Sequence, residues 1–179
     1  MALHRFGIKL FAAGPADVRV KDFVPVFHSW IQRQAVEGHL LIDVHDYGHI
    51  ENGPGILLVD HEGNFCTDMA EGKLGLAYFR KQPAGVSVES HLDAALKAVR
   101  QAASLLEKEP VFEGGLRFRK DELLVIANDR LLAPNDAATF ATLRSPLTKV
   151  FGANAKLTHL SANPKDRLTL RVQVPVPSS

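Results

Sequence analysis

The sequence predicts an α+β fold, built mainly on antiparallel sheet with three main helices, in one domain over residues 1–177. Three observations predict this fold. The chain has 179 residues, of which 46% are hydrophobic and 23% are charged, as in an ordinary globular domain. Short turns join runs of alternating apolar residues, which favours antiparallel pairing because parallel strands need long crossover connections. Three other segments repeat their apolar residues at helical spacing.

The first half of the chain, about residues 1–82, is predicted to be a strand, a helix and then four strands. Phe6–Ala12 should be the first strand, ended by Gly14-Pro15. Asp22 should cap the first helix, and Gly38 should end it. The strands that follow are expected at Leu40–Tyr47, Gly55–His61, Phe65–Met69 and Leu74–Lys81.

A helix over about residues 88–108 should join this half to the second, at about residues 111–175. Ser87 or Ser90 is the expected cap of this helix, and Asn135 or Asp136 the cap of the next one. Pro146 should kink or restart that third helix, because proline lacks a backbone N–H. The strands are expected at Leu116–Lys120 and Glu122–Asn128, around a turn at Lys120-Asp121, and at Ala155–Leu160 and Leu168–Val174.

The two halves share the order β-α-β-β. A duplicated β-α-β-β unit would explain this order, with the central helix as its connector. The alternative is chance, because a helix after a strand is common in α+β proteins and the halves share few identical residues.

Charge and cysteine content exclude several classes of function. The chain carries 21 basic and 20 acidic residues, so it lacks the basic surplus typical of a nucleic-acid-binding domain. Its one cysteine, Cys66, allows no disulfide within the chain and no thiolate-rich zinc site, which indicates a reducing compartment. No apolar run approaches the roughly 20 residues that span a bilayer. We therefore expect a soluble, cytoplasmic protein with no nucleic-acid or membrane partner.

The candidate site residues lie in the strands of the first half: Asp43, His45, Tyr47, His49 and His61. If Ile42 and Val44 pair with Ile56 and Leu58 on the apolar face, the opposite face holds Asp43, His45, Tyr47 and His61. Two imidazoles and a carboxylate suit a metal such as zinc or iron, and they also suit acid–base chemistry. The alternative is a plain, half-solvated polar face, because the chain shows no recognised spacing of metal ligands.

Two further features of this region have simpler interpretations. Cys66 is expected to be a small core residue rather than a nucleophile. Asn52-Gly53-Pro54-Gly55 leads into a strand rather than a helix, so it is a loop that can border a ligand pocket rather than a phosphate-binding loop.

Two hypotheses for function follow. The leading one is a non-enzymatic binding or homo-oligomeric assembly module, for instance a homodimer, whose partner is a small molecule or a protein. It rests on apolar strands, exposed sheet edges and the lack of a catalytic motif. The alternative is a small metal-dependent or acid–base enzyme centred on Asp43, His45 and His61. Apart from zinc or iron at that cluster, the sequence implies no cofactor.

Overall fold

A computed structural model describes residues 3–14, 18–51, 53–83 and 85–175. Within these ranges it confirms the predicted fold class: three α-helices and one sheet of eight antiparallel strands. Pro15, Asn52 and the residues after Pro175 lie outside the described residues. The strands are β1 Phe6–Ala12, β2 Leu41–Tyr47, β3 Gly55–Asp60, β4 Gly63–Asp68, β5 Gly75–Arg80, β6 Phe118–Ala127, β7 Lys156–His159 and β8 Thr169–Gln173. The helices are α1 Phe23–Arg33, α2 Val88–Glu107 and α3 Ala137–Phe151, with short 3₁₀ turns η1 Val20–Asp22, η2 Ala70–Gly72 and η3 Pro110–Phe112.

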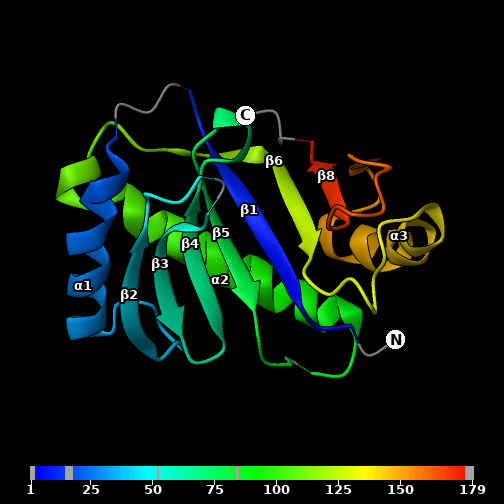
Figure 1. The fold of residues 1–179 in the computed structure, drawn as a ribbon, viewed down its shortest axis with the longest axis horizontal. Helices are drawn as coiled ribbons and strands as arrows, with labels where there is room; N and C mark the ends of the chain where they lie inside the picture. Colours follow the sequence, from blue (N-terminus) through cyan, green and yellow to red (C-terminus); the bar gives the residue numbers. More distant parts are fainter. Residues whose placement is uncertain (1–2, 15–17, 52, 84, 176–179) are drawn as a thin grey trace.

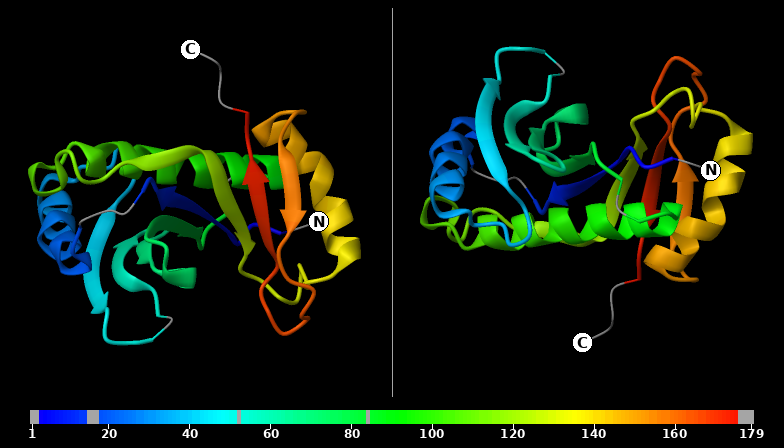
Figure 2. Two further views of the ribbon diagram at one scale, coloured as in Figure 1. Left: turned by 90° about the horizontal axis from the view of Figure 1, so that it is seen from above. Right: turned by 90° about the horizontal axis from the view of Figure 1, so that it is seen from below.

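The strands follow the order β2-β3-β4-β5-β1-β6-β8-β7, so β2 and β7 form the two edges of the sheet. The run β2 to β5 is the predicted meander of neighbouring antiparallel strands. Helix α2 packs against β1 and β5 behind the middle of the sheet, α1 lies beside β2, and α3 packs against α2 at the other end (Figures 1 and 2). None of the helices in the described ranges is long and apolar enough to cross a membrane.

The hydrophobic core lies between the sheet and the helices. Every second residue of β1, namely Phe6, Ile8 and Leu10, is buried in it, as expected for a strand with one face on the core. Trp30 of α1 and Val99 of α2 are fully buried in the same cluster. The helical spacing read from the sequence therefore identified the buried faces of α1 and α2 correctly.

Within the described ranges, none of the α-helices covers the other face of the sheet. Lys9 of β1 points to that face and is nevertheless only 1% exposed. Its Nζ lies 3.3 Å from the Asp68 carboxylate and donates to the Lys73 carbonyl at 3.1 Å. Gly75 on β5 makes room for this side chain, because a Cβ there would come within 2.4 Å of the Lys9 Cε atom. Side chains of the sheet itself therefore cover part of the helix-free face and shield Lys9 from solvent.

The ends of α1 differ from the prediction. Asp22 does not cap the helix, because η1 runs directly into α1 and gives Asp22 a helical backbone. Its carboxylate instead accepts a hydrogen bond from Arg19 at 3.0 Å. The helix ends at Arg33 rather than near Gly38, because Gln34 adopts the left-handed conformation, with φ of 46°.

The helix caps of the later segments are confirmed. The Ser87 hydroxyl accepts from the Ser90 N–H at the start of α2, and the Ser90 hydroxyl accepts in turn from the Ser87 N–H. At α3, the Asp136 carboxylate accepts from the Thr139 N–H at 2.7 Å.

One prediction about the second half is wrong. The segment expected to turn at Lys120-Asp121 is one continuous strand, β6, because the Asp121 carbonyl accepts from the Val174 N–H beside β8. The Asp121 carboxylate binds the Arg119 guanidinium. Of the two alternatives for Pro146, the restart is wrong, since α3 continues through it, and the kink stays a prediction. A proline inside a helix removes a single backbone donor, and the neighbouring turns hold the helix together here.

Hydrogen bonds from side chains protect the outer edge of β2. The Gln34 side chain accepts from the Leu41 N–H and donates to the Leu41 carbonyl, both at 3.0 Å. The Asp43 carboxylate accepts from the Val44 N–H at 2.8 Å. These bonds occupy backbone groups that would otherwise be free to pair with another strand.

The β-α-β-β order is present in both halves, as β1-α1-β2-β3 and β6-α3-β7-β8. In the second half β8 lies next to β6, whereas in the first half β4 and β5 separate β3 from β1. Duplication of the unit therefore stays a prediction.

Candidate functional site

The pairing of β2 with β3 places three of the predicted site residues on one face. Val44 is opposite Leu58, as predicted, so Asp43, His45 and Tyr47 share the helix-free face of β2. The register shifts between Leu41 and Asp43, and Ile42 is consequently 52% exposed rather than in the core. The expectation that Ile42 lies with Val44 on the apolar face beside Ile56 and Leu58 is therefore wrong for Ile42.

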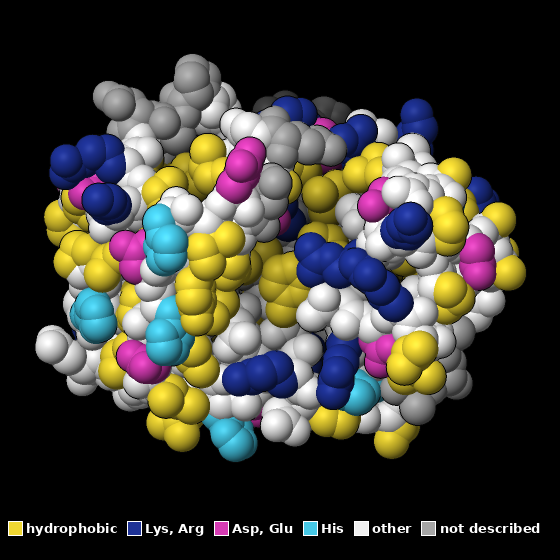
Figure 3. Space-filling view, in the orientation of Figure 1, with side chains coloured by type: hydrophobic (Ala, Val, Ile, Leu, Met, Phe, Trp, Pro, Cys, Tyr) yellow, Lys and Arg dark blue, Asp and Glu magenta, His cyan; other side chains and the backbone are white. Residues whose placement is uncertain are grey.

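The contacts among these residues are weak and open to solvent. His45 Nε2 lies 3.5 Å from the Asp43 carboxylate, and the two side chains are 45% and 56% exposed. The His45 ring stacks on Tyr47 at a centroid distance of 5.9 Å. Figure 3 shows histidine side chains gathered on the side of the molecule where β2 lies.

His61 and His49 lie apart from this group. His61 is exposed in the β3–β4 turn, and its backbone N–H donates to the Leu40 carbonyl. His49 is in the β2–β3 loop and lines a pocket described below. Within the described ranges, no group of three or more histidine, cysteine, aspartate or glutamate side chains is arranged to hold a metal ion. The zinc or iron site stays a prediction without structural support.

The β2–β3 loop, η1 and η2 enclose a pocket of about 740 Å³, which we call the loop pocket. Its apolar side chains are Val20, Ile50, Ile56, Met69 and Ala70. Gly48, Gly53 and Gly55 also line it, so part of its wall is bare backbone. The glycine-rich β2–β3 loop therefore borders a pocket, which the sequence had indicated as one role for it.

Polar side chains of both charges complete the loop pocket: Arg19, Lys21, His49, Asp46 and Asp68. Several of them already have a partner. Arg19 pairs with Asp22, Asp68 pairs with the buried Lys9, and Asp46 accepts from the Gly48 N–H at 2.9 Å. The Lys21 ammonium makes no ion pair with a described residue, so it is free to meet a ligand.

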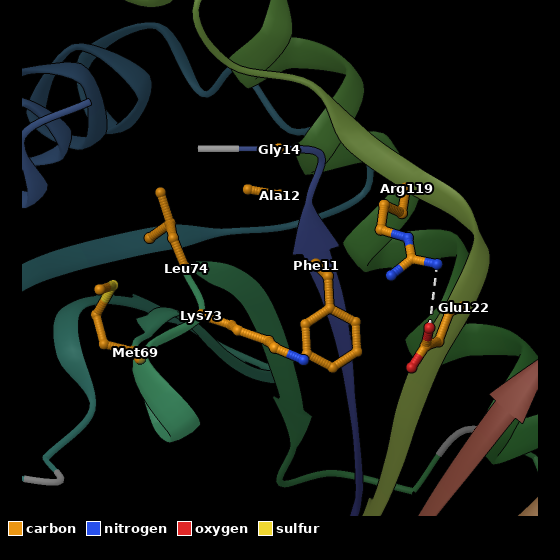
Figure 4. Close-up of a pocket in the computed structure, with 9 residues that line it drawn as sticks. Phe11, Ala12, Gly14, Met69, Lys73, Leu74, Arg119 and Glu122 are labelled. Carbon is orange, nitrogen blue, oxygen red and sulfur yellow. Dashed lines mark ion pairs between the residues drawn. The ribbon is translucent and has the colours of Figure 1, made fainter. Parts of the chain in front are cut away.

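A second pocket, of about 390 Å³, lies on the other side of Met69, which lines both (Figure 4). Figure 4 shows Arg119 and Glu122 on β6 across the pocket from Met69, with the Phe11 ring between them. The Arg119 guanidinium and the Glu122 carboxylate are 3.1 Å apart and neutralise each other. The second pocket is smaller than the loop pocket. Two of its charged side chains, Arg119 and Glu122, pair with each other, whereas Lys73 makes no ion pair with a described residue.

A buried group of polar residues that the sequence did not reveal lies at the opposite end of β3. The Asp60 carboxylate is fully buried, and its Oδ2 atom is 2.6 Å from His39 Nδ1 and 2.9 Å from the Tyr78 hydroxyl. Burial alone would raise the pKa of Asp60, but the hydrogen bonds from His39 and Tyr78 outweigh it, and the pKa lies below its usual value. Burial and the Asp60 charge raise the pKa of Tyr78, so its hydroxyl keeps its proton.

Cys66 is a core residue, as predicted. Its side chain is buried on β4, and burial together with the Asp68 charge raises its pKa to about 12. A thiol with so high a pKa holds its proton at neutral pH and is a poor nucleophile.

The chain was also compared with known proteins, and it matched no family model, no curated protein and no solved structure.

Proposed function

We propose that this protein is a binding module for a small organic molecule, which it holds in the loop pocket. The observation that supports the proposal is the pocket's size and lining. Small-molecule sites usually measure about 300–1,000 Å³ and combine a mainly apolar wall with a few polar groups. The loop pocket, at about 740 Å³, falls in this range, and its lining combines apolar side chains with about as many polar ones.

The lining also favours a type of ligand. Val20, Ile56 and Met69 supply apolar surface for the body of the molecule. Lys21 and His49 supply a cation and a hydrogen-bonding ring without an ion-pair partner among the described residues, whereas Lys9 neutralises the Asp68 carboxylate. A molecule with an apolar body and one anionic or hydrogen-bond-accepting group fits these surroundings best.

Binding of anilinonaphthalene sulfonate, a fluorescent probe with apolar rings and one anionic group, tests the proposal. We expect the folded protein to bind it saturably. Ala70 lines the pocket from η2, and an Ala70→Trp substitution should fill the space and weaken binding by about ten-fold or more, equivalent to about 1.4 kcal/mol. Fluorescence titration measures this loss of affinity.

Ala141→Trp is the matched control, because Ala141 is exposed on α3 and lies outside the pocket. It adds the same side chain and should leave the affinity unchanged. If both variants bound the probe equally well, the probe would bind outside the loop pocket. If the wild-type protein showed no saturable binding, the proposal would be wrong.

Other partners and activities expected from the sequence have less support. A metal-dependent or acid–base enzyme centred on Asp43, His45 and His61 would need a site that excludes water, but the Asp43 and His45 side chains are about half exposed. Homo-oligomerisation and a protein partner stay predictions, and the protected edge of β2 gives pairing through that strand no support.

A further inference from the structure

We propose that His39 is a nucleophilic histidine that reacts with small acyl donors through its Nε2 atom. The observation behind this proposal is the buried pair that His39 forms with Asp60. Its Nδ1 atom is 2.6 Å from the Asp60 carboxylate, which is fully buried, while the His39 side chain is 11% exposed. This site lies at the end of β3 opposite the loop pocket and does not depend on the proposed binding function.

The pairing fixes the position of the imidazole proton. An ionised carboxylate can only accept hydrogen bonds, so the proton of the short contact belongs to His39 Nδ1. The Tyr78 hydroxyl donates to the same carboxylate oxygen, so this oxygen is the acceptor in both hydrogen bonds. A neutral His39 therefore carries its lone pair on Nε2, which is the form that attacks an electrophile or accepts a proton.

Packing fixes the orientation of the ring. The His39 ring meets Phe65 and Tyr78 edge-on, at centroid distances of 5.7 and 5.6 Å. No described residue forms a hydrogen bond with its Nε2 atom. The arrangement, a buried carboxylate that orients an imidazole with a free second nitrogen, is the one that activates histidine in enzymes.

Two other histidines, the buried His91 and the partly buried His159, differ from His39. Both ring nitrogens of His91 contact backbone carbonyls, at 2.9 and 3.2 Å. The Nε2 atom of His159 is 2.6 Å from the Asn135 side chain. Neither ring is paired with a carboxylate in this way, so both are useful comparisons.

The charged groups around the pair support the ionised form of Asp60. Glu62 donates its backbone N–H toward the Asp60 carboxylate at 3.4 Å, and its own carboxylate pairs with Arg80. Arg80 is almost fully buried and lies beside Tyr78, so its positive charge acts on the same cluster. His61, next to Asp60 in the chain, is exposed.

The proposed reaction balances without a further reagent. The Nε2 lone pair forms a bond to the acyl carbon, and the bond between that carbon and its leaving-group oxygen breaks, so the leaving group departs with the electron pair. The Asp60 carboxylate compensates the positive charge on the acylated ring, because Nδ1 keeps its proton. Water then attacks the acyl carbon and the N–C bond breaks, so its electron pair returns to Nε2; the carboxylic acid is released, one proton passes to the solvent, and the neutral imidazole is restored.

Hydrolysis of p-nitrophenyl acetate tests this reaction on the full chain. We expect the wild-type protein to release p-nitrophenolate above the buffer rate. His39→Gln should lose most of this excess, about ten-fold or more, given that groups of this kind contribute about 100-fold or more in enzymes. The matched control, His159→Gln, should keep it. An unchanged rate in His39→Gln would overturn the proposal.

Two measurements on the wild-type protein decide the matter if His39→Gln does not fold. The nitrogen chemical shifts of the His39 ring should show a proton on Nδ1 and a lone pair on Nε2. Brief treatment with diethyl pyrocarbonate, followed by peptide mass spectrometry, should modify His39 faster than the exposed His61, although His39 is the more buried. A proton on Nε2, or slower modification of His39, would contradict the proposal.

Discussion

At the residue scale, Asp60 connects segments that are distant in the chain. Its carboxylate joins His39, before β2, to Tyr78 in β5, and it is fully buried. A buried charge is stable only when hydrogen bonds replace its lost hydration. The depressed pKa of Asp60 shows that these hydrogen bonds more than compensate for burial.

This pKa gives the protein a pH-dependent stability. The folded value lies below the unfolded one of about 3.9, so the Asp60 contribution is complete above about pH 4 and is lost as the pH falls through the folded value. We expect Asp60→Asn to lower the free energy of unfolding by about 2 kcal/mol near neutral pH. The difference should shrink below about pH 4, where wild-type Asp60 also loses its charge.

Urea unfolding over this pH range measures the effect. Asp93→Asn serves as the control, because Asp93 is half-exposed on α2 and pairs only with the exposed Lys97, a type of contact worth little. A difference between wild-type and Asp60→Asn that stays constant down to the lowest pH would show that the Asp60 charge does not stabilise the fold.

Some of the important single residues could be predicted from the sequence, and others could not. Sequence reasoning found the caps Ser87 and Asp136, because their signal is local. It missed His39, whose partner is 21 residues away, because the pairing depends on the register that sets Leu41 opposite Asp60. The spacing of the two predicted strands carried a signal for this pairing, but the bulge at Ile42 makes the strand register hard to derive from the sequence.

At the element scale, the end of α1 and the edge of β2 form one structural unit. Gln34 ends the helix in a left-handed conformation that usually favours glycine, which costs about 1 kcal/mol or more. The side chain compensates, because it binds the Ile31 carbonyl and both backbone groups of Leu41.

Gln34→Ala should therefore lower the free energy of unfolding by about 2 kcal/mol, because three hydrogen bonds are lost and the strained backbone remains. Thermal or urea unfolding measures the loss. Sedimentation velocity should also show more self-association than in the wild type, since the freed edge of β2 can pair with another chain.

The neighbouring Gln32→Ala is the matched control, since Gln32 is exposed on the same helix and should tolerate alanine. Gln34→Gly should be intermediate, because glycine relieves the positive φ without restoring the hydrogen bonds. If Gln34→Ala were as stable as Gln32→Ala, the side chain would not hold the two elements together.

Helices and strands could be predicted from the sequence where the apolar periodicity is strong. They were predicted poorly where pairing with a distant segment determines the structure. The face of α2 and the β2–β5 meander follow from spacing and turn residues. The false turn at Lys120-Asp121 shows the opposite case, because the N–H of Val174, which directly follows β8 and lies about fifty residues later in the chain, donates to the Asp121 carbonyl and keeps β6 extended.

At the scale of the whole molecule, helices cover one face of the sheet and leave the other free of them. On the free face, several histidine side chains lie toward β2, and lysine and arginine side chains lie both at the upper left of the view and over the middle and right of the molecule (Figure 3). The sequence predicted an α+β fold with mainly antiparallel sheet and three main helices, and strands with one apolar face need a layer of helices. It indicated that the β2–β3 loop can border a pocket, but it did not reveal that η1 and η2 meet this loop and complete the pocket.

The measurement that tests the binding proposal most directly is an NMR titration of the ¹⁵N-labelled protein with anilinonaphthalene sulfonate. We predict that the amide signals that shift belong to residues around the loop pocket, such as Val20, Gly53 and Ala70, and that those of β7 and α3 stay in place. Shifts centred on another part of the molecule, or no shifts at saturating probe, would contradict the assignment of the loop pocket as the binding site.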